Sequence, residues 1–159
     1  MNTRFQWPVT PQAHPDNMVS YKNWRFTVLT DRLIRMEYDP EGVFEDRASQ
    51  RVFYRDLPAC AYLVSRENGV LTIHTGALLL TYQEERAFSA DSLSVQLLLE
   101  PASKWNFGES FETLGGTCKT LDGVDGACPI EKGLCSRWGF SVLDDSKTLL
   151  LDENGWVTV

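Results

Sequence analysis

Long apolar runs are missing from this sequence. No segment approaches the roughly 18 consecutive apolar residues that a membrane-spanning helix requires. Residues 1–16, MNTRFQWPVTPQAHPD, also lack the apolar centre of a secretory signal. We therefore expect no membrane partner, no export and a cytoplasmic location.

Histidine is scarce, and the cysteines are not arranged for metal. The only histidines are His14 and His74. Three of the four cysteines, Cys118, Cys128 and Cys135, follow the pattern C-x9-C-x6-C without a C-x2-C pair or a nearby histidine. This spacing does not match a structural zinc site, so we interpret all four as reduced, packed side chains. We expect no metal and no cofactor.

An excess of positive charge is also absent. The chain has 15 Lys and Arg against 22 Asp and Glu, a net charge of −7. That balance excludes nucleic acid and anionic membrane as main partners. With 159 residues, 43% of them hydrophobic and 23% charged, the chain is expected to form one ordinary globular domain.

No helical period persists over ten residues, whereas alternating apolar residues recur throughout. Asn68-Gly69 is the clearest hairpin turn. Short strands separated by turns predict an all-β fold, an antiparallel β-sandwich over 21–159 preceded by an extended lead-in over 1–20. Strands are expected at 25–30, 33–38, 61–65, 70–75, 77–83 and 93–99, with a short one at 52–54 and a pair at 140–143 and 148–151.

A glycine-rich region interrupts this pattern at 106–146. Six of the eleven glycines lie between Gly115 and Gly139. Ordering so much glycine is entropically costly, and long loops in compact domains are usually functional or disordered. The region also carries large apolar residues, among them Leu134, Trp138 and Phe140. We interpret it as a surface that meets another molecule or domain.

Residue patterns for a self-sufficient active site are weak. A Ser-His-Asp arrangement through His74 has no supporting motif, and His74 is expected to face solvent. Gly115-Gly116 is followed by neither Gly-Lys-Ser/Thr nor a helix, so it is not a phosphate-binding loop. Three carboxylate pairs could pose as acid and base, although turn chemistry explains them better: Asp122/Asp125, Glu109/Glu112 and Asp144/Asp145.

Several separated blocks resemble, in order, the N-terminal domain of glycoside hydrolase family 31, which includes α-glucosidases and α-xylosidases. The resemblance covers about residues 20–159. The blocks are Arg25–Thr30, Arg32–Tyr38, Gly42–Arg47, Phe107-Gly108-Glu109, Leu114–Thr117, Lys119–Asp122, Gly133–Gly139 and Leu143–Ser146.

This resemblance implies a galactose-mutarotase-like β-sandwich that precedes a (β/α)8 barrel. In the family the barrel carries both catalytic aspartates of a retaining hydrolase, and neither barrel motif occurs in this sequence. The chain is therefore expected to be a truncated N-terminal domain without catalytic residues of its own. Its partner would be the barrel of the parent chain, and the oligosaccharide substrate would be met only indirectly.

A loop of the family's sandwich reaches over the barrel's substrate pocket and often carries an Arg-Asp pair. Arg137 matches the arginine, whereas Trp138 stands where the aspartate would be. Arg137 and Trp138 are thus the candidate pocket-loop residues, and the pair is expected at the tip of the glycine-rich region. Trp138 either packs against the barrel, which we favour, or stacks on a sugar ring.

Two other functions stay open. A stand-alone carbohydrate-binding module would use exposed aromatic residues to stack on sugars. A mutarotase-like enzyme is suggested by fold kinship alone, and the two histidines are poorly placed for it. For the accessory domain we also predict an apolar patch around Leu134, Trp138 and Phe140 that leads to self-association.

Overall fold

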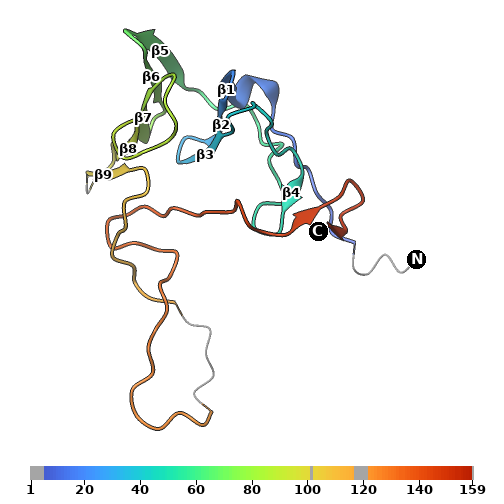
Figure 1. Ribbon diagram of the computed structural model, residues 1–159, viewed down its shortest axis with the longest axis vertical. Helices are drawn as coiled ribbons and strands as arrows, with labels where there is room; N and C mark the ends of the chain where they lie inside the picture. Colours follow the sequence, from blue (N-terminus) through green and yellow to red (C-terminus); the bar gives the residue numbers. More distant parts are fainter. Residues whose placement is uncertain (1–5, 101, 117–121, 159) are drawn as a thin grey trace.

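The chain folds into β-strands joined by turns and loops (Figure 1). The computed structural model describes residues 6–100, 102–116 and 122–158. A short 3-10 helix, Pro15–Asn17, leads into the first sheet. That sheet has three antiparallel strands: β1 (Met18–Tyr21), β2 (Trp24–Thr30) and β3 (Leu33–Tyr38). Strand β1 therefore begins inside the segment that we expected to be an extended lead-in.

The second sheet is a five-stranded antiparallel meander. Its hairpins follow the turn signals, with Asn68 and Gly69 both at positive φ in the turn between β5 and β6. The strands are β5 (Leu63–Glu67), β6 (Val70–His74), β7 (Leu78–Gln83), β8 (Leu93–Leu97) and β9 (Ser103–Asn106). Strand β9 is not among those expected from the sequence.

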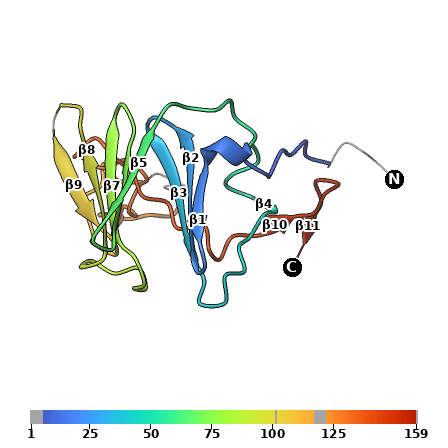
Figure 2. The same cartoon turned by 90° about the horizontal axis from the view of Figure 1, so that it is seen from above.

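The two sheets pack face to face, as Figure 2 shows, which confirms the all-β sandwich. Alternation in β2 sends Trp24, Phe26 and Val28 into the core, where they meet Leu80 and Tyr82 of β7. Phe26 is fully buried, and its ring centroid lies 5.5 Å from that of Tyr82. Burial of such side chains contributes about 1.5–3 kcal/mol each.

A third, small sheet covers the outer face of the three-stranded sheet (Figure 2). It joins β4 (Ala48–Ser49), β10 (Leu150–Leu151) and β11 (Val157–Thr158). Leu29 on the outer face is consequently buried, as are Ala48 and Leu151. The small sheet thus turns the three-stranded sheet into the middle layer of the molecule.

Two expectations about pairing are wrong. Residues 140–143 form no strand, and Leu150 and Leu151 pair with β4 and β11 instead. The expected edge strand at 52–54 is reduced to isolated bridges, Ser49 with Val52 and Thr10 with Tyr54. In both cases the pairing partner comes from a remote part of the chain, which local alternation does not reveal.

Candidate functional site

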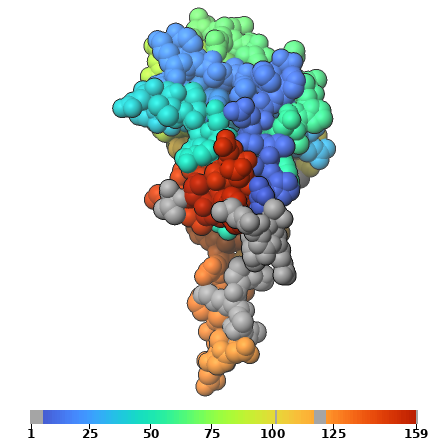
Figure 3. All heavy atoms as spheres, turned by 90° about the vertical axis from the view of Figure 1, so that its right-hand side faces the viewer, coloured from blue at the N-terminus to red at the C-terminus, as the bar shows by residue number. Residues whose placement is uncertain are grey.

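The glycine-rich region forms an arm that projects from the sandwich (Figures 1 and 3). We define the arm as residues 112–137; residues 117–121, including Cys118 and part of the family-like blocks, lie outside the described residues. Its two limbs are joined by backbone hydrogen bonds from Arg137 N to Glu112 O (3.2 Å) and from Leu114 N to Cys135 O (2.9 Å). The arm is therefore an ordered ribbon at its base.

Glycine allows the limbs of the arm to touch. Gly116 N donates to Glu131 O at 2.7 Å. A Cβ atom on Gly133 would lie 2.1 Å from the carbonyl oxygen of Gly115, closer than any real contact. Gly133 is thus required by the close approach of the two backbones, whereas a Cβ on Gly116 would lie 3.3 Å from the nearest carbonyl oxygens and need only a small shift.

Large apolar side chains stand exposed along the arm. Leu114 is 69% exposed, Ile130 75% and Leu134 56%. Trp138, at the base, is 52% exposed, whereas Phe140 is half-buried with its ring 5.1 Å from that of Phe111. Two members of the expected patch, Leu134 and Trp138, are therefore on the surface, and the third packs against the arm's base.

Arg137 and Trp138 lie at the base of the arm and not at its tip, which corrects our expectation. The carbonyl oxygen of Trp138 accepts a hydrogen bond from Ser103 Oγ of β9 at 3.0 Å. The Arg137 side chain is 67% exposed and 3.8 Å from Glu112 Oε2, an exposed ion pair that contributes little. The ribbon beyond residue 137 returns to the sandwich, because the Ser136 turn fixes it there.

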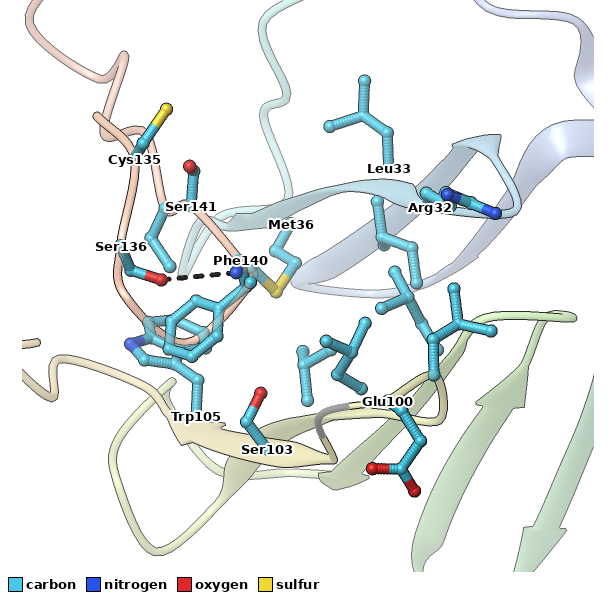
Figure 4. Close-up of a pocket in the computed structure, with 17 residues that line it drawn as sticks. Arg32, Leu33, Met36, Glu100, Ser103, Trp105, Cys135, Ser136, Phe140 and Ser141 are labelled. Carbon is cyan, nitrogen blue, oxygen red and sulfur yellow. Dashed lines mark hydrogen bonds between the residues drawn. The ribbon is translucent and has the colours of Figure 1, made fainter. Parts of the chain in front are cut away.

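That turn is held by Ser136, which is buried. Its Oγ accepts hydrogen bonds from Trp138 N (3.1 Å) and Phe140 N (3.3 Å), the second drawn as the dashed line in Figure 4. The Ser136 hydroxyl thus accepts hydrogen bonds from backbone N–H groups that have no strand partner in this turn. It thereby sets the directions of the Trp138 and Phe140 side chains.

Beside this turn lies a groove of about 640 Å³, which we call the arm-base groove (Figure 4). Its walls come from β3, from residues of β7, β8 and β9, and from residues 135–142. Neither Arg137 nor Trp138 lines it. The hydroxyls of Ser103 and Ser136 already serve backbone groups, so the groove offers mainly apolar contact. Its apolar lining comprises Leu33, Ile34, Met36, Leu78, Val95, Leu97, Leu99, Trp105, Phe140 and Val142.

A second groove, of about 820 Å³, follows the other half of β3; we call it the β3-edge groove. Met36, Trp105 and Val142 line both grooves, so the two are adjacent. Strand β3 ends its sheet, with β2 on one side alone. The small-sheet side of this groove is polar, with Arg35, Glu37, Glu45 and Asp145 in its wall.

The described residues contain no assembled set of catalytic side chains. His74 is exposed on β6, as expected, and hydrogen-bonds no serine or carboxylate there. Glu109 Oε2 accepts from both nitrogens of Asn106, and Asp144 accepts from Ser146 N, so both are engaged in turns. Within the described ranges no three His, Cys, Asp or Glu side chains could hold a metal ion, and Cys60, Cys128 and Cys135 are free thiols.

Sequence reasoning missed both grooves and the strand β9 that supplies Trp105. The alternation signal for β9 is short, because the strand has four residues and Trp105 is its one buried side chain. A second missed feature is a set of arginines on the outer face of the middle sheet. Arg25 and Arg35 fall on the outward side of two correctly expected strands, which the alternation alone indicates.

No protein-family model matches this chain, and no curated protein matches it. Across the described residues no helix is both long enough and apolar enough to cross a membrane. The family-like blocks and the geometry of the arm are therefore the basis for any functional proposal.

Proposed function

We propose that the chain is a non-catalytic N-terminal β-sandwich domain of a family 31 α-glycosidase. In this proposal it packs on the (β/α)8 barrel of its parent and contributes a loop to the barrel's substrate pocket. The observation that carries the proposal is the projecting arm with Leu114, Ile130 and Leu134 exposed. Apolar side chains displayed on one projecting extension favour a docking role.

The chemistry of the parent would then be divided between two domains. The barrel would supply both aspartates for retaining hydrolysis of an O-glycosidic bond. The sandwich would supply a loop that shapes the barrel's substrate pocket. Trp138 would pack on the barrel, since its 52% exposed ring lies next to the apolar arm. A cytoplasmic location belongs to the same proposal and is consistent with the three free cysteines.

A direct test uses the chain as it stands with a chromogenic α-glucoside. No turnover is expected, because no acid–base pair is assembled in the described part of the chain. Turnover that copurifies with the protein and survives repeated purification would contradict the proposal.

Docking is tested by adding a purified family 31 barrel that lacks its own sandwich. Binding is expected and should be lost when Leu134→Ser and Trp138→Ser are combined. The matched control is Leu63→Ser, since Leu63 is 74% exposed on β5, away from the arm. Binding that is equally weakened by the control, or unaffected by the arm variant, would contradict the role of the arm.

A carbohydrate-binding module is the second candidate, and one feature favours it. Trp7, Phe53 and Tyr54 form an aromatic group, with ring centroids 5.4 Å and 6.3 Å apart. Trp7 is 54% and Tyr54 51% exposed, so their faces are open to a sugar. Titration calorimetry with maltose distinguishes the candidates. A binding heat in the native chain that is lost in Tyr54→Ala supports the module. No binding heat in the native chain supports the accessory domain.

A further inference from the structure

Three arginines meet around a single backbone carbonyl between the middle layer and the loop that covers it. The carbonyl oxygen of Glu45 accepts from Arg55 Nη1 at 3.1 Å, from Arg35 Nη1 at 3.2 Å and from Arg25 Nη2 at 3.4 Å. Arg25 comes from β2 and Arg35 from β3, whereas Arg55 follows the small strand β4. Three positive charges are thus held within a few ångströms of one another.

Two of these arginines form ion pairs with carboxylates, and the third does not. Arg25 holds Glu37 through both carboxylate oxygens, at 2.7 and 3.0 Å, and also contacts Asp46. Arg35 Nη2 shares Glu37, at 3.0 Å. Arg55 forms no ion pair with any described carboxylate. Two carboxylates, Glu37 and Asp46, therefore form ion pairs with the cluster, while Asp145 and the Glu45 carboxylate act on Arg55 only at longer range.

Arg55 is nevertheless buried, with 2% of its surface exposed. Its Nε and Nη2 atoms are buried without a hydrogen-bond partner, and so is Nε of Arg35. Burial, reinforced by the positive charge of Arg35, lowers the pKa of Arg55 to about 10. An unsatisfied buried charge is one of the more costly features that a folded chain can carry.

One of the three arginines, Arg35, lines the β3-edge groove, together with Glu45 and Asp145. Arg55 does not line the groove and is linked to its wall by the hydrogen bond to the Glu45 carbonyl. Asp145 is close enough to stabilise the charge of Arg55, but its Oδ2 accepts from Ser49 Oγ at 3.0 Å. Asp145 therefore acts on Arg55 through its charge and forms no hydrogen bond that the described residues show to the Arg55 guanidinium, whose Nε and Nη2 stay unpartnered.

We propose that Arg35 and Arg55 form a binding site for a small oxyanion that enters from the β3-edge groove. The ligand presents oxygen acceptors, of a phosphate, sulfate or carboxylate group, to Arg55 Nε and Nη2 and to Arg35 Nε. A guanidinium fork binds such oxygens in pairs, and the unpartnered nitrogens of Arg35 and Arg55 supply donors for them. The site is independent of the family assignment.

The first test follows the arginine Nε–H signals of the 15N-labelled chain by NMR. Sodium chloride is exchanged for sulfate, phosphate or acetate at constant ionic strength. A saturable shift confined to Arg35 and Arg55 is expected. Saturation by sulfate or phosphate identifies a tetrahedral ligand, and saturation by acetate a carboxylate; both support the site. Shifts in no arginine, or equal shifts in all arginines, would overturn it.

The second test uses stability. At ten times the dissociation constant, an oxyanion that binds the folded state alone shifts the folding equilibrium by about tenfold. Arg55→Met should lose the sulfate-dependent rise in melting temperature. Arg86→Met, a change at an exposed arginine between β7 and β8, should retain it. A sulfate-dependent rise in melting temperature that Arg55→Met retains would overturn the proposal. If that variant does not fold, the NMR experiment on the native chain decides.

Asp145→Asn separates the proposal from a simple internal ion pair. If Asp145 in solution is the partner of Arg55, the substitution moves the Arg55 Nε signal and no anion does, which would overturn the proposal. An oxyanion site predicts the opposite, with anion-dependent shifts retained or strengthened in Asp145→Asn because a nearby negative charge has been removed.

Discussion

Gly155 shows at the residue scale how a single missing Cβ fixes a crossing of the chain. Its φ is +77°, and a Cβ there would lie 1.9 Å from the carbonyl oxygen of Trp7. Trp7 N in turn donates to Gly155 O at 3.2 Å. The contact between the N-terminal segment and the turn before β11 therefore requires glycine at position 155.

Gly155→Ala is expected to destabilise the fold by more than Gly69→Ala. Both positions have positive φ, which costs an alanine about 1–2 kcal/mol. A Cβ on Gly69 would meet nothing within 4 Å, whereas the Cβ at 155 would also have to displace backbone. Urea denaturation of the two variants measures the difference, and equal losses would contradict this account.

Glu45 should make stability sensitive to acid. Hydrogen bonds from the Arg47 side chain lower the pKa of Glu45 from 4.5 to about 2. A carboxylate whose pKa is lowered on folding contributes stability above its unfolded pKa and loses it as pH falls through the folded value. The contribution of Glu45 should therefore disappear between pH 4.5 and about 2.

The measurement is the urea midpoint as a function of pH in Glu45→Gln and in the native chain. The two curves should converge toward pH 2. Glu41→Gln is the matched control, because the Glu41 side chain is exposed on the same loop and has no hydrogen bond or ion pair in the part of the chain described. A parallel offset at every pH would show that Glu45 acts by packing and not by titration.

The arm is the element whose removal separates docking from folding. Within the described part of the chain, residues 122–130 make no hydrogen bond and no ring contact to either large sheet. Gly116 and Glu131 are already joined by a hydrogen bond, so a short turn can close the gap between them.

Replacing residues 117–130 with a short Gly-Asn turn is expected to leave the melting temperature nearly unchanged. The reason is that the sandwich core contains no side chain from the described part of that segment, residues 122–130. Thermal unfolding followed by circular dichroism checks this, and barrel binding measured in parallel should fall. A large cooperative loss of stability would show that the arm is part of the folding unit.

The two large sheets depend on one another at the scale of the whole molecule. Phe26 is fully buried at their interface, with ring centroids of Trp24 at 5.3 Å and Phe88 at 5.6 Å. Phe26→Ala should cost about 3–5 kcal/mol, because it removes a large side chain and leaves a cavity. Val64→Ala, at a residue 42% exposed on β5, serves as the control in the same urea titration. A loss below about 1 kcal/mol at Phe26 would contradict the assignment of this core.

Self-association is expected from the exposed apolar residues of the arm and its base. Leu134 and Trp138 are more than half exposed, and burying them in a second copy removes apolar surface from water. Sedimentation equilibrium should show a concentration-dependent rise in mass. The rise should be weaker in the combined Leu134→Ser and Trp138→Ser variant than in Leu63→Ser. A monomer at millimolar concentration would contradict the prediction.

Local alternation was enough to predict β2, β3 and β5 to β8, which form most of the two large sheets. Residues 24–30 and 33–38 alternate between core and outer face, and the Asn68-Gly69 turn is encoded in adjacent residues. Strand existence follows from such short-range patterns because side chains alternate with a period of two. The all-β class was therefore available from the sequence.

Pairings and sites between remote segments were not available in this way. Leu151 lies beside Ala48, about a hundred residues away, and the expected partner at 140–143 is no strand. The placement of Trp138 at the base of the arm depends on Ser103, and the burial of Arg55 depends on the loop over the middle sheet. The sequence by itself determined which residues alternate, turn and carry charge, since these are properties of neighbours along the chain. The grooves, the base of the arm and the unpartnered arginines were decided by tertiary structure, because each is formed by segments that only packing brings together.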